Sequence, residues 1–281
     1  MTTVGLIGLG AMGSGMAASL RRAGHEVQVF DVRREVAAGF AQEGGTAHET
    51  LASLGAASDV IVSVVVNAAQ TESVLFGDGT TPGCAASMKP GSVFVMCSTV
   101  DPNWSVALEA RLEAMGLRYV DAPISGGAAK AASGQMTMMT AGKPEAYALA
   151  EPFLNAMAAK VYKLGDSAGA GSKVKIINQL LAGVHIAAAA EAMALGLREG
   201  VDANALYEVI TNSAGNSWMF ENRMAHVLAA DYTPLSAVDI FVKDLGIVLD
   251  MARASKFPLP LSSTAHQMFM QDSTAGLAKV D

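Results

Sequence analysis

A lysine and an amide stand at the start of the longest helical pattern in the chain. Lys175 and Asn178 are three residues apart in Gly171-Ser-Lys-Val-Lys-Ile-Ile-Asn178, so on a helix they are neighbours on one face. Burying both groups is costly unless a partner or a ligand uses them. Oxidation of an alcohol needs a group that accepts the hydroxyl proton and a group that orients the substrate. We predict that Lys175 accepts the proton and that Asn178 holds the substrate oxygen or orients the lysine.

Other interpretations of these side chains stay open. Burial and nearby positive charge favour the neutral form of Lys175 that a base needs, but a lysine at a helix start can also extend its amine to solvent, as we expect for Lys173. His185 lies seven residues beyond Asn178, about 10 Å along the helix, which is too far to share one substrate with Lys175. We therefore expect a core or interface histidine. No histidine pair has i, i+4 spacing, so we predict no metal site.

A glycine-rich loop near the N-terminus predicts a dinucleotide site. The apolar run Val4–Ile7 leads into the loop, and a helical pattern, Met16–Arg22, and a second strand, Val27–Phe30, follow it. In that context the glycines allow a tight turn, close approach of a pyrophosphate and close helix packing, and the helix N-terminus faces the phosphates. A glycine-rich turn without a ligand is the alternative. The predicted cofactor-binding residues of the loop are Gly8, Leu9, Gly10, Ala11, Met12 and Gly13.

The acid after the second strand favours NAD over NADP. Asp31 can accept a hydrogen bond from a ribose 2′-hydroxyl, and its charge would repel a 2′-phosphate. Arg33 and Arg34 follow closely, and an arginine nearby is how NADP is accommodated. These arginines also fit a solvated helix start. We predict NAD.

Polar residues leave the next strands at the edge where ligands of parallel sheets bind. Asp59–Val66 is an apolar run typical of a buried strand, and Ser92–Met96 is the following strand. We predict cofactor contacts from the residues at these strand ends, although polar residues there are also ordinary turn formers. The candidates are Val65, Val66, Asn67 and Thr99.

A serine and two glycines after the strand Arg118–Asp121 could hold a carboxylate. The sequence is Asp121-Ala-Pro-Ile-Ser-Gly-Gly127. Glycines after a serine free the backbone to present N–H groups in a concave turn, and a flexible loop is the alternative. We predict that Ser125, Gly126 and Gly127 bind the substrate.

Alternating strands and helices up to residue 164, then helices alone, predict the architecture. We expect an α/β fold in which a Rossmann-type dinucleotide-binding domain, residues 1–164, precedes an all-α domain, residues 165–281, organised around one long helix. Residues Gly165–Gly171 form the glycine-rich boundary. The expected helices are Ser172–Arg198, Ala203–Ser213, Asn216–Ala230, Ser236–Ser255 and Ser262–Gln271.

The composition indicates which cellular compartment and which classes of partner to expect. Hydrophobic residues make up 51% of the 281 residues, charged residues 16%, and the net charge is −7 with no basic run, which argues against a nucleic-acid partner. Two cysteines without paired spacing and the lack of a secretory signal pattern favour the cytoplasm. The segment Ile176–Leu197 has the length of a membrane span but contains Asn178, Gln179, His185 and Glu191. We therefore predict no membrane contact and a soluble helix buried nearly all round, covered partly by a second copy in a homodimer or homotetramer.

Four motifs together resemble the β-hydroxyacid dehydrogenase family, which includes 3-hydroxyisobutyrate dehydrogenase and tartronate semialdehyde reductase. The motifs are GLIGLGAMGSGMA, DAPISGG, GSKVKIIN and FVKDLG (Phe241–Gly246), and they span essentially the whole chain. The resemblance implies NAD-linked oxidation of a hydroxyacid with Lys175 as the catalytic residue. It also implies that Ser125, Gly126, Gly127 and Asn178 hold the substrate, that Thr99 touches the nicotinamide side, and that Lys243 reaches the cofactor.

Within that family, two stretches resemble the branch of L-threonate dehydrogenases. These are Asn178–Ile186 and Ala214–Arg223, supported by Ser236–Lys243. This resemblance implies oxidation of a four-carbon sugar acid at C2 to 2-dehydro-L-erythronate. Polar residues in Asn216–Arg223 suit such a substrate better than an apolar hydroxyacid, although a helix cap and a solvated face explain them too. Activity on 3-hydroxyisobutyrate or tartronate semialdehyde, or a non-catalytic dinucleotide-binding module, are the alternatives.

Overall fold

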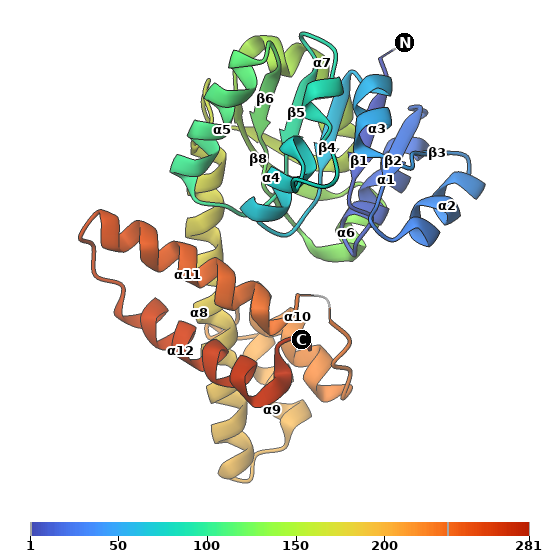
Figure 1. Ribbon diagram of the computed structural model, residues 1–281. Coiled ribbons are helices and arrows are strands. Elements are labelled where there is room, and N and C mark those ends of the chain that lie inside the picture. Colours follow the sequence, from blue (N-terminus) through green and yellow to red (C-terminus); the bar gives the residue numbers. More distant parts are fainter. Residues whose placement is uncertain (1, 235, 281) are drawn as a thin grey trace. The chain divides into compact units, whose positions relative to one another are not determined.

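A computed structural model describes residues 2–234 and 236–280. The chain divides into two compact units, Met1–Lys175 and Ile176–Asp281, and the division falls inside the long helix α8 (Ala170–Arg198). The strands labelled in Figure 1 all belong to the first unit.

One twisted sheet organises the first unit. Its strands are β1 (Val4–Ile7), β2 (Val27–Phe30), β3 (Thr46–Ala47), β4 (Val60–Ser63), β5 (Val93–Met96), β6 (Arg118–Asp121), β7 (Ile124–Ser125), β8 (Met136–Gly142) and β9 (Ala158–Lys163). The spatial order is β3-β2-β1-β4-β5-β6-β8-β7, with β9 on β8. The six strands from β3 to β6 are parallel, and β8 pairs antiparallel to both β6 and β7. Because the order reverses between β1 and β4, the ligand-binding crevice of a doubly wound sheet is expected at their carboxyl ends.

Helices cover both faces of this sheet. They are α1 (Gly13–Arg22), α2 (Arg34–Gln42), α3 (Leu51–Ala57), α4 (Ala68–Phe76), the short turn η1 (Ala85–Ser87), α5 (Pro102–Ala114), α6 (Gly127–Ser133) and α7 (Pro144–Met157). One buried cluster joins the strands to α1, α2, α6 and α7, and the other joins them to α3, α4 and α5.

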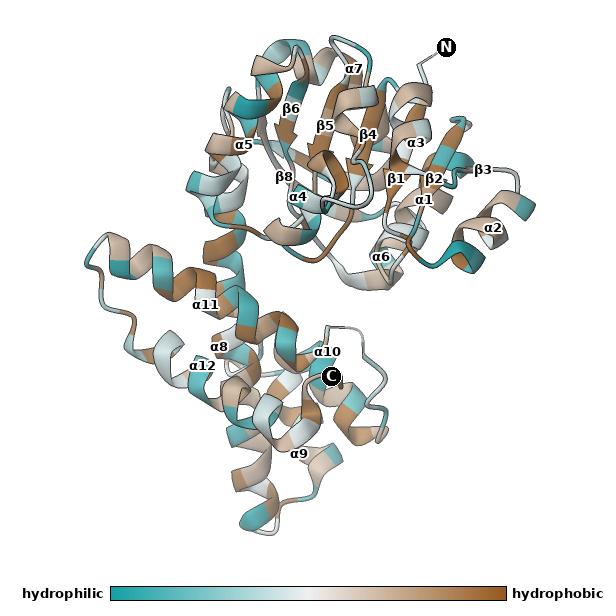
Figure 2. Cartoon of the chain, in the orientation of Figure 1, coloured by the Kyte–Doolittle hydropathy of each residue, from teal (hydrophilic) through white to brown (hydrophobic). Residues whose placement is uncertain are grey.

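The central strands are apolar because both of their faces are buried. Val60 and Val62 of β4 belong to one cluster and Ile61 to the other, since successive side chains of a strand point to opposite faces. Figure 2 shows the hydrophobic colour concentrated on β1, β4 and β5. Parallel strands with helices on both faces have this composition. The predicted Rossmann-type sheet is confirmed.

The second unit is helical within its described residues. After α8 come α9 (Ala203–Thr211), α10 (Trp218–Leu228), α11 (Val238–Ala254), α12 (Pro260–Asp272) and the π-turn η2 (Ser273–Leu277). One buried cluster joins α8, α11 and α12, and a smaller one joins α8 to α10. Gly183 allows α11 to approach closely, because a Cβ there would lie 2.9 Å from the Leu245 side chain. The predicted helical C-terminal half is confirmed.

Within the single chain α8 is not buried all round, and its predicted coverage by a second copy stays a prediction. Ile177, Leu181 and Leu195 are 53%, 51% and 62% exposed. Among the described residues, α8 passes a length and composition test for a membrane span, with a mean hydropathy of 1.7, but core helices of soluble proteins pass the same test. That result is not enough to indicate a membrane protein. Apolar composition alone does not tell how much of a helix its own chain covers.

Candidate active site

The glycine loop between β1 and α1 has the geometry that a dinucleotide requires. Gly8 has φ +91°, and a Cβ there would lie 2.5 Å from the Val64 carbonyl oxygen. A Cβ on Gly13 would lie 1.8 Å from the Gly8 carbonyl oxygen, so the loop folds tightly onto itself. A Cβ on Gly10 would meet no atom within 4 Å, apart from its chain neighbours. The first and third glycines are therefore needed by the fold, whereas Gly10 faces open space, as close approach of a pyrophosphate would require.

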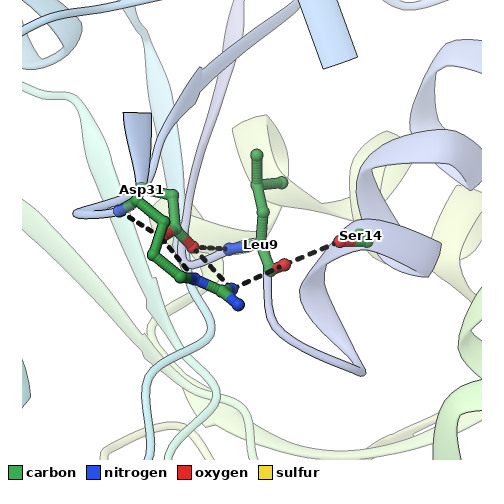
Figure 3. Close-up of polar contacts among 4 residues, drawn as sticks. Leu9, Ser14 and Asp31 are labelled. Atoms are coloured by element: carbon green, nitrogen blue, oxygen red, sulfur yellow. Dashed lines mark hydrogen bonds and ion pairs between the residues drawn. The ribbon is translucent and has the colours of Figure 1, made fainter. Parts of the chain in front are cut away.

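Asp31, the first residue after β2, closes over this loop (Figure 3). Its carboxylate accepts hydrogen bonds from the backbone N–H groups of Leu9, at 2.6 Å, and Arg33, at 2.8 Å. The Arg33 guanidinium donates to the same carboxylate at 3.2 Å and to the Leu9 carbonyl oxygen at 3.2 Å. Burial alone would raise the pKa of Asp31, but these hydrogen bonds and the Arg33 charge outweigh it and lower the pKa. The acid is thus held ionised beside the loop, where a ribose hydroxyl can donate to it.

The residues predicted at the next strand ends also have local structural roles. Asn67 caps α4, with its side chain accepting from the Gln70 N–H at 2.8 Å, and the Gln70 side chain accepts from the Val66 N–H at 2.8 Å. Ser98, next to the predicted Thr99, donates to the Val65 carbonyl oxygen at 2.7 Å. Val65, Val66 and Asn67 begin two residues after the end of the parallel strand β4, where the crevice is expected. Their contact with a cofactor stays a prediction.

The Ser125-Gly126-Gly127 turn has a backbone that only glycines adopt readily. Ser125 ends β7 and pairs with Thr137 of β8, while Gly126 and Gly127 have φ values of +137° and +75°. Gly127 starts α6, and a Cβ on it would meet no atom within 4 Å. The turn therefore leaves its backbone accessible at a helix start, as a carboxylate cradle requires. The structure places this turn between the short strand β7 and the helix α6, and its contact with a substrate stays a prediction.

Lys175 lies buried on the first unit's part of α8. It is 7% exposed, and Ser172, one turn earlier, and Gln179, one turn later, are buried on the same face. Ser172 hydrogen-bonds the buried Asp121 carboxylate at the end of β6. Asn178 is only partly buried, so the buried amide one turn beyond the lysine is that of Gln179.

A polar chain in the second unit joins two predicted site residues. Asn178 donates to the Gln179 side chain at 3.1 Å, and Gln179 donates to Asp244 at 2.6 Å. The other oxygen of Asp244 accepts from the Lys243 amine at 2.5 Å. Asp244 is 1% exposed and stands beside a lysine in FVKDLG. Sequence reasoning missed Gln179 and Asp244, although their positions beside Asn178 and Lys243 were a signal.

The polar stretch after α9 is partly a helix cap. Ser217 caps α10 by accepting from the Phe220 N–H at 3.0 Å, and Asn216 donates to the Thr211 carbonyl oxygen at 3.1 Å. A hollow of about 300 Å³ lies next to this cap. It is lined by Tyr207, Trp218, Glu221, Asn222, Ala225 and His226. Among the described residues, no group of three or more potential metal ligands occurs.

Comparison with known proteins identifies the family. Residues 3–165 match the NAD-binding domain of 6-phosphogluconate dehydrogenase, and residues 169–281 match the NAD-binding domain of NADP-dependent 3-hydroxyisobutyrate dehydrogenase. The chain belongs to the family of dehydrogenases that resemble 3-hydroxyisobutyrate dehydrogenase. It is an oxidoreductase of the NAD-dependent hydroxyacid dehydrogenase class, acting on CH–OH groups, and its predicted NAD-binding domain is confirmed.

Several relatives cover nearly the whole chain. An L-threonate dehydrogenase from Cupriavidus necator is 66% identical over 97% of this chain and 91% of its own length. A mitochondrial 3-hydroxyisobutyrate dehydrogenase from Drosophila melanogaster is 31% identical over 99% of this chain and 86% of its length. A crystal structure named 3-hydroxyisobutyrate dehydrogenase, from Salmonella typhimurium, is 50% identical and superposes with a TM-score of 0.95, covering 100% of this chain and 97% of that one.

Proposed function

We propose that the protein oxidises L-threonate at C2 to 2-dehydro-L-erythronate, with NAD as hydride acceptor and Lys175 as general base. The observation that carries the substrate is the 66% identity to an L-threonate dehydrogenase over 97% of the chain. Four further relatives of that name are 48–50% identical over 99% of the chain. Polar groups at Asn216–Arg223 support a hydroxylated substrate.

Different residues bind the substrate, accept its proton and contact the cofactor. Bound NAD supplies the acceptor for the hydride that leaves C2. Backbone N–H groups of Gly126 and Gly127, with the Ser125 hydroxyl, hold the substrate carboxylate. The Lys175 amine takes the C2 hydroxyl proton, and Asn178 orients the hydroxyl or the lysine. Lys243, held by Asp244, contacts the cofactor.

NAD binds at the carboxyl ends of the parallel strands in the first unit. The loop residues Gly8, Leu9, Gly10, Ala11, Met12 and Gly13 bind the pyrophosphate and Asp31 binds the adenosine ribose. Val65, Val66 and Asn67 contact the cofactor, and Thr99 touches its nicotinamide side. NADP remains the alternative dinucleotide, because a similar solved structure at 25% identity is in complex with NADP⁺.

Removing the lysine amine tests the base. Lys175→Ala should abolish threonate oxidation while NADH binding, followed by fluorescence, stays near the wild-type value. Lys173→Ala, two residues away and exposed, is the matched control and should keep full activity. If Lys175→Ala keeps turnover within a few-fold of the wild-type rate, the assignment of Lys175 is wrong.

A panel of substrates distinguishes L-threonate oxidation from the second candidate function, oxidation of 3-hydroxyisobutyrate. The 50% identical Salmonella structure, which is named 3-hydroxyisobutyrate dehydrogenase, favours that activity. Initial rates should be compared for L-threonate, D-threonate, D-glycerate, L-serine and 3-hydroxyisobutyrate with NAD and then with NADP. A higher kcat/KM for 3-hydroxyisobutyrate than for L-threonate would overturn the sugar-acid assignment.

The protein is cytoplasmic in this proposal and forms a homodimer or homotetramer. The exposed apolar side of α8 supports the contact between copies. Val174, Ile177, Leu181 and Leu195 are each more than 40% exposed and fall on one side of the helix by its periodicity. In this proposal residues 165–281 form the substrate and oligomerisation domain. Leu181→Lys should lower the mass measured by light scattering, and Leu197→Lys, on the opposite side of α8, is the control. An unchanged mass for Leu181→Lys would contradict the contact.

A further inference from the structure

We propose that Asp121 is a positioning residue that fixes the first turn of α8 and thereby places the Lys175 amine against the substrate. This inference rests on the proposed function, because it gives Asp121 a part in the reaction only if Lys175 takes the proton. Asp121 itself is not assigned any contact with substrate or cofactor.

The carboxylate of Asp121 caps the helix from the end of a strand. It is fully buried; one oxygen accepts from the Gly169 and Ser172 N–H groups, both at 2.9 Å, and the other accepts from the Ser172 hydroxyl at 2.7 Å. The first N–H groups of a helix have no partner within the helix, and a negative charge is favoured near them. A residue 51 positions earlier in the chain therefore provides the cap of α8.

Backbone packing holds the same turn from another side. A Cβ on Gly171 would lie 2.4 Å from the Met139 carbonyl oxygen and 3.0 Å from that of Asp121, so α8 starts directly against β8 and β6. A second buried carboxylate, Glu109, accepts from the Ala168 N–H at 3.1 Å. The segment that leads into α8 is thus fixed by two acids and by a close backbone contact.

The fixed turn determines where the lysine points. Ser172 and Lys175 are three residues apart and both buried, so they lie on one face of the first turns of α8. A shift of the Ser172 turn moves Lys175 with it. Because misplacement of a reacting group by about 1 Å can slow a reaction by roughly 100-fold, the anchor of this turn bears on rate.

The same segment of chain also carries the proposed carboxylate cradle. Ser125 is four residues beyond Asp121, and the segment between them is held by the hydrogen bond from the Met139 N–H to the Pro123 carbonyl oxygen, at 2.9 Å. The turn that binds the substrate and the helix that carries the base are therefore anchored to one stretch, residues 121–125. Through Asp121 this stretch sets the distance between the cradle and the Lys175 amine.

The hydrogen bonds of Asp121 can be separated from its charge. Burial raises the pKa of Asp121, and hydrogen bonds from Ser172 and Gly169 oppose that rise. In Asp121→Asn the amide oxygen can accept from both N–H groups, while the amide nitrogen donates to the Ser172 hydroxyl, which can also accept. Asp121→Asn therefore keeps the anchor without the charge, and Asp121→Ala loses both.

The experiment measures the rate constant of NADH formation in a single turnover of L-threonate, with full-length enzyme and NAD in excess. This rate constant does not depend on the folded fraction, so a purely structural defect does not change it. We expect Asp121→Ala to be roughly 10- to 100-fold slower than wild type. The rate constant of Ser172→Ala should lie between those of wild type and Asp121→Ala. We expect Asp121→Asn within about three-fold of wild type, an unchanged Kd for NADH, and a wild-type rate for the exposed control Lys173→Ala.

Gly171→Ala gives a second perturbation that removes no polar group. Its Cβ displaces the start of α8 from Met139, and we expect it also to slow the single turnover. The proposal is overturned if Asp121→Ala reacts at the wild-type rate, or if Asp121→Asn is as slow as Asp121→Ala. If Asp121→Ala does not fold, wild-type rates for both Ser172→Ala and Gly171→Ala overturn it. Turnover by Lys175→Ala would instead refute the proposed function.

Discussion

Replacing Asp31 by asparagine should remove the preference for NAD. The two carboxylate oxygens of Asp31 accept from the Leu9 and Arg33 N–H groups, and each also accepts from the Arg33 guanidinium, so a ribose hydroxyl would bind in place of that guanidinium. Asparagine has one acceptor oxygen, so its amide nitrogen must face one of these N–H donors. A hydrogen bond to a charged group contributes about 1.5–3 kcal/mol. The Kd for NADH should therefore rise roughly 10- to 150-fold.

The assay compares the Kd values of NADH and NADPH by fluorescence titration at one ionic strength. NADPH binding should hold or improve in Asp31→Asn, because the 2′-phosphate no longer meets a carboxylate and the Arg33 guanidinium is released. Asp59→Asn is the matched control, since Asp59 also accepts from a backbone N–H, that of Thr3, and from a cation, Lys89. An NADH Kd within about two-fold of wild type, or an equal loss of NADPH affinity, would refute the reasoning.

Asp31 should also make the stability of the folded protein depend on pH. Burial opposes ionisation of Asp31, but the hydrogen bonds from Arg33 and Leu9 prevail, so its pKa is lower in the folded protein than in the unfolded chain. Its stabilising contribution is therefore complete above the unfolded pKa of about 3.9 and is lost as pH falls through the folded pKa. The Tm difference between wild type and Asp31→Asn should shrink when the pH is lowered from about 6 to below about 4.

Three further predictions concern groups whose surroundings are fixed by the structure. Gly10→Ala should keep the wild-type Tm but lose NADH binding, whereas Gly13→Ala, whose Cβ meets the Gly8 carbonyl oxygen, should lower the Tm; equal Tm values would contradict this. Burial raises the pKa of Cys84 to about 12 and also raises that of Cys97, so neither thiol should react with a disulfide reagent at about pH 8 until denaturant is added. Burial also raises the pKa of Glu109, and its Oε1 has no hydrogen-bond partner among the described residues, so its ionised form costs stability as pH rises. Glu109→Gln should raise the Tm at about pH 8 and lose that advantage near pH 4, as thermal melts at the two pH values would show.

The nucleotide half of the fold was predictable because its signals are local. Tight turns, close packing and an acid at a strand end each depend on a few adjacent residues, and Gly8, Gly13 and Asp31 stand where the sequence predicts them. The extent of α8 was also predictable, but its surroundings were not. Leu181 and Leu195 are apolar, yet their apolar character does not say whether the same chain or a second copy covers them.

In the candidate site, too, local features were predictable from the sequence and long-range contacts were not. Lys175 and Asn178 could be singled out because a helix places them together whatever the rest of the chain does. Gln179 and Asp244 were missed because their bond joins residues 65 positions apart, and neither residue type is unusual where it stands. Asp121 was identified only as the end of a strand for a similar reason, since its partner Ser172 is 51 positions away. Sequence patterns therefore indicate which groups can react, whereas the groups that hold them in place depend on long-range pairing. Comparing Asp121→Ala with Lys175→Ala tests this distinction directly, because loss of the anchor should slow the reaction and loss of the amine should stop it.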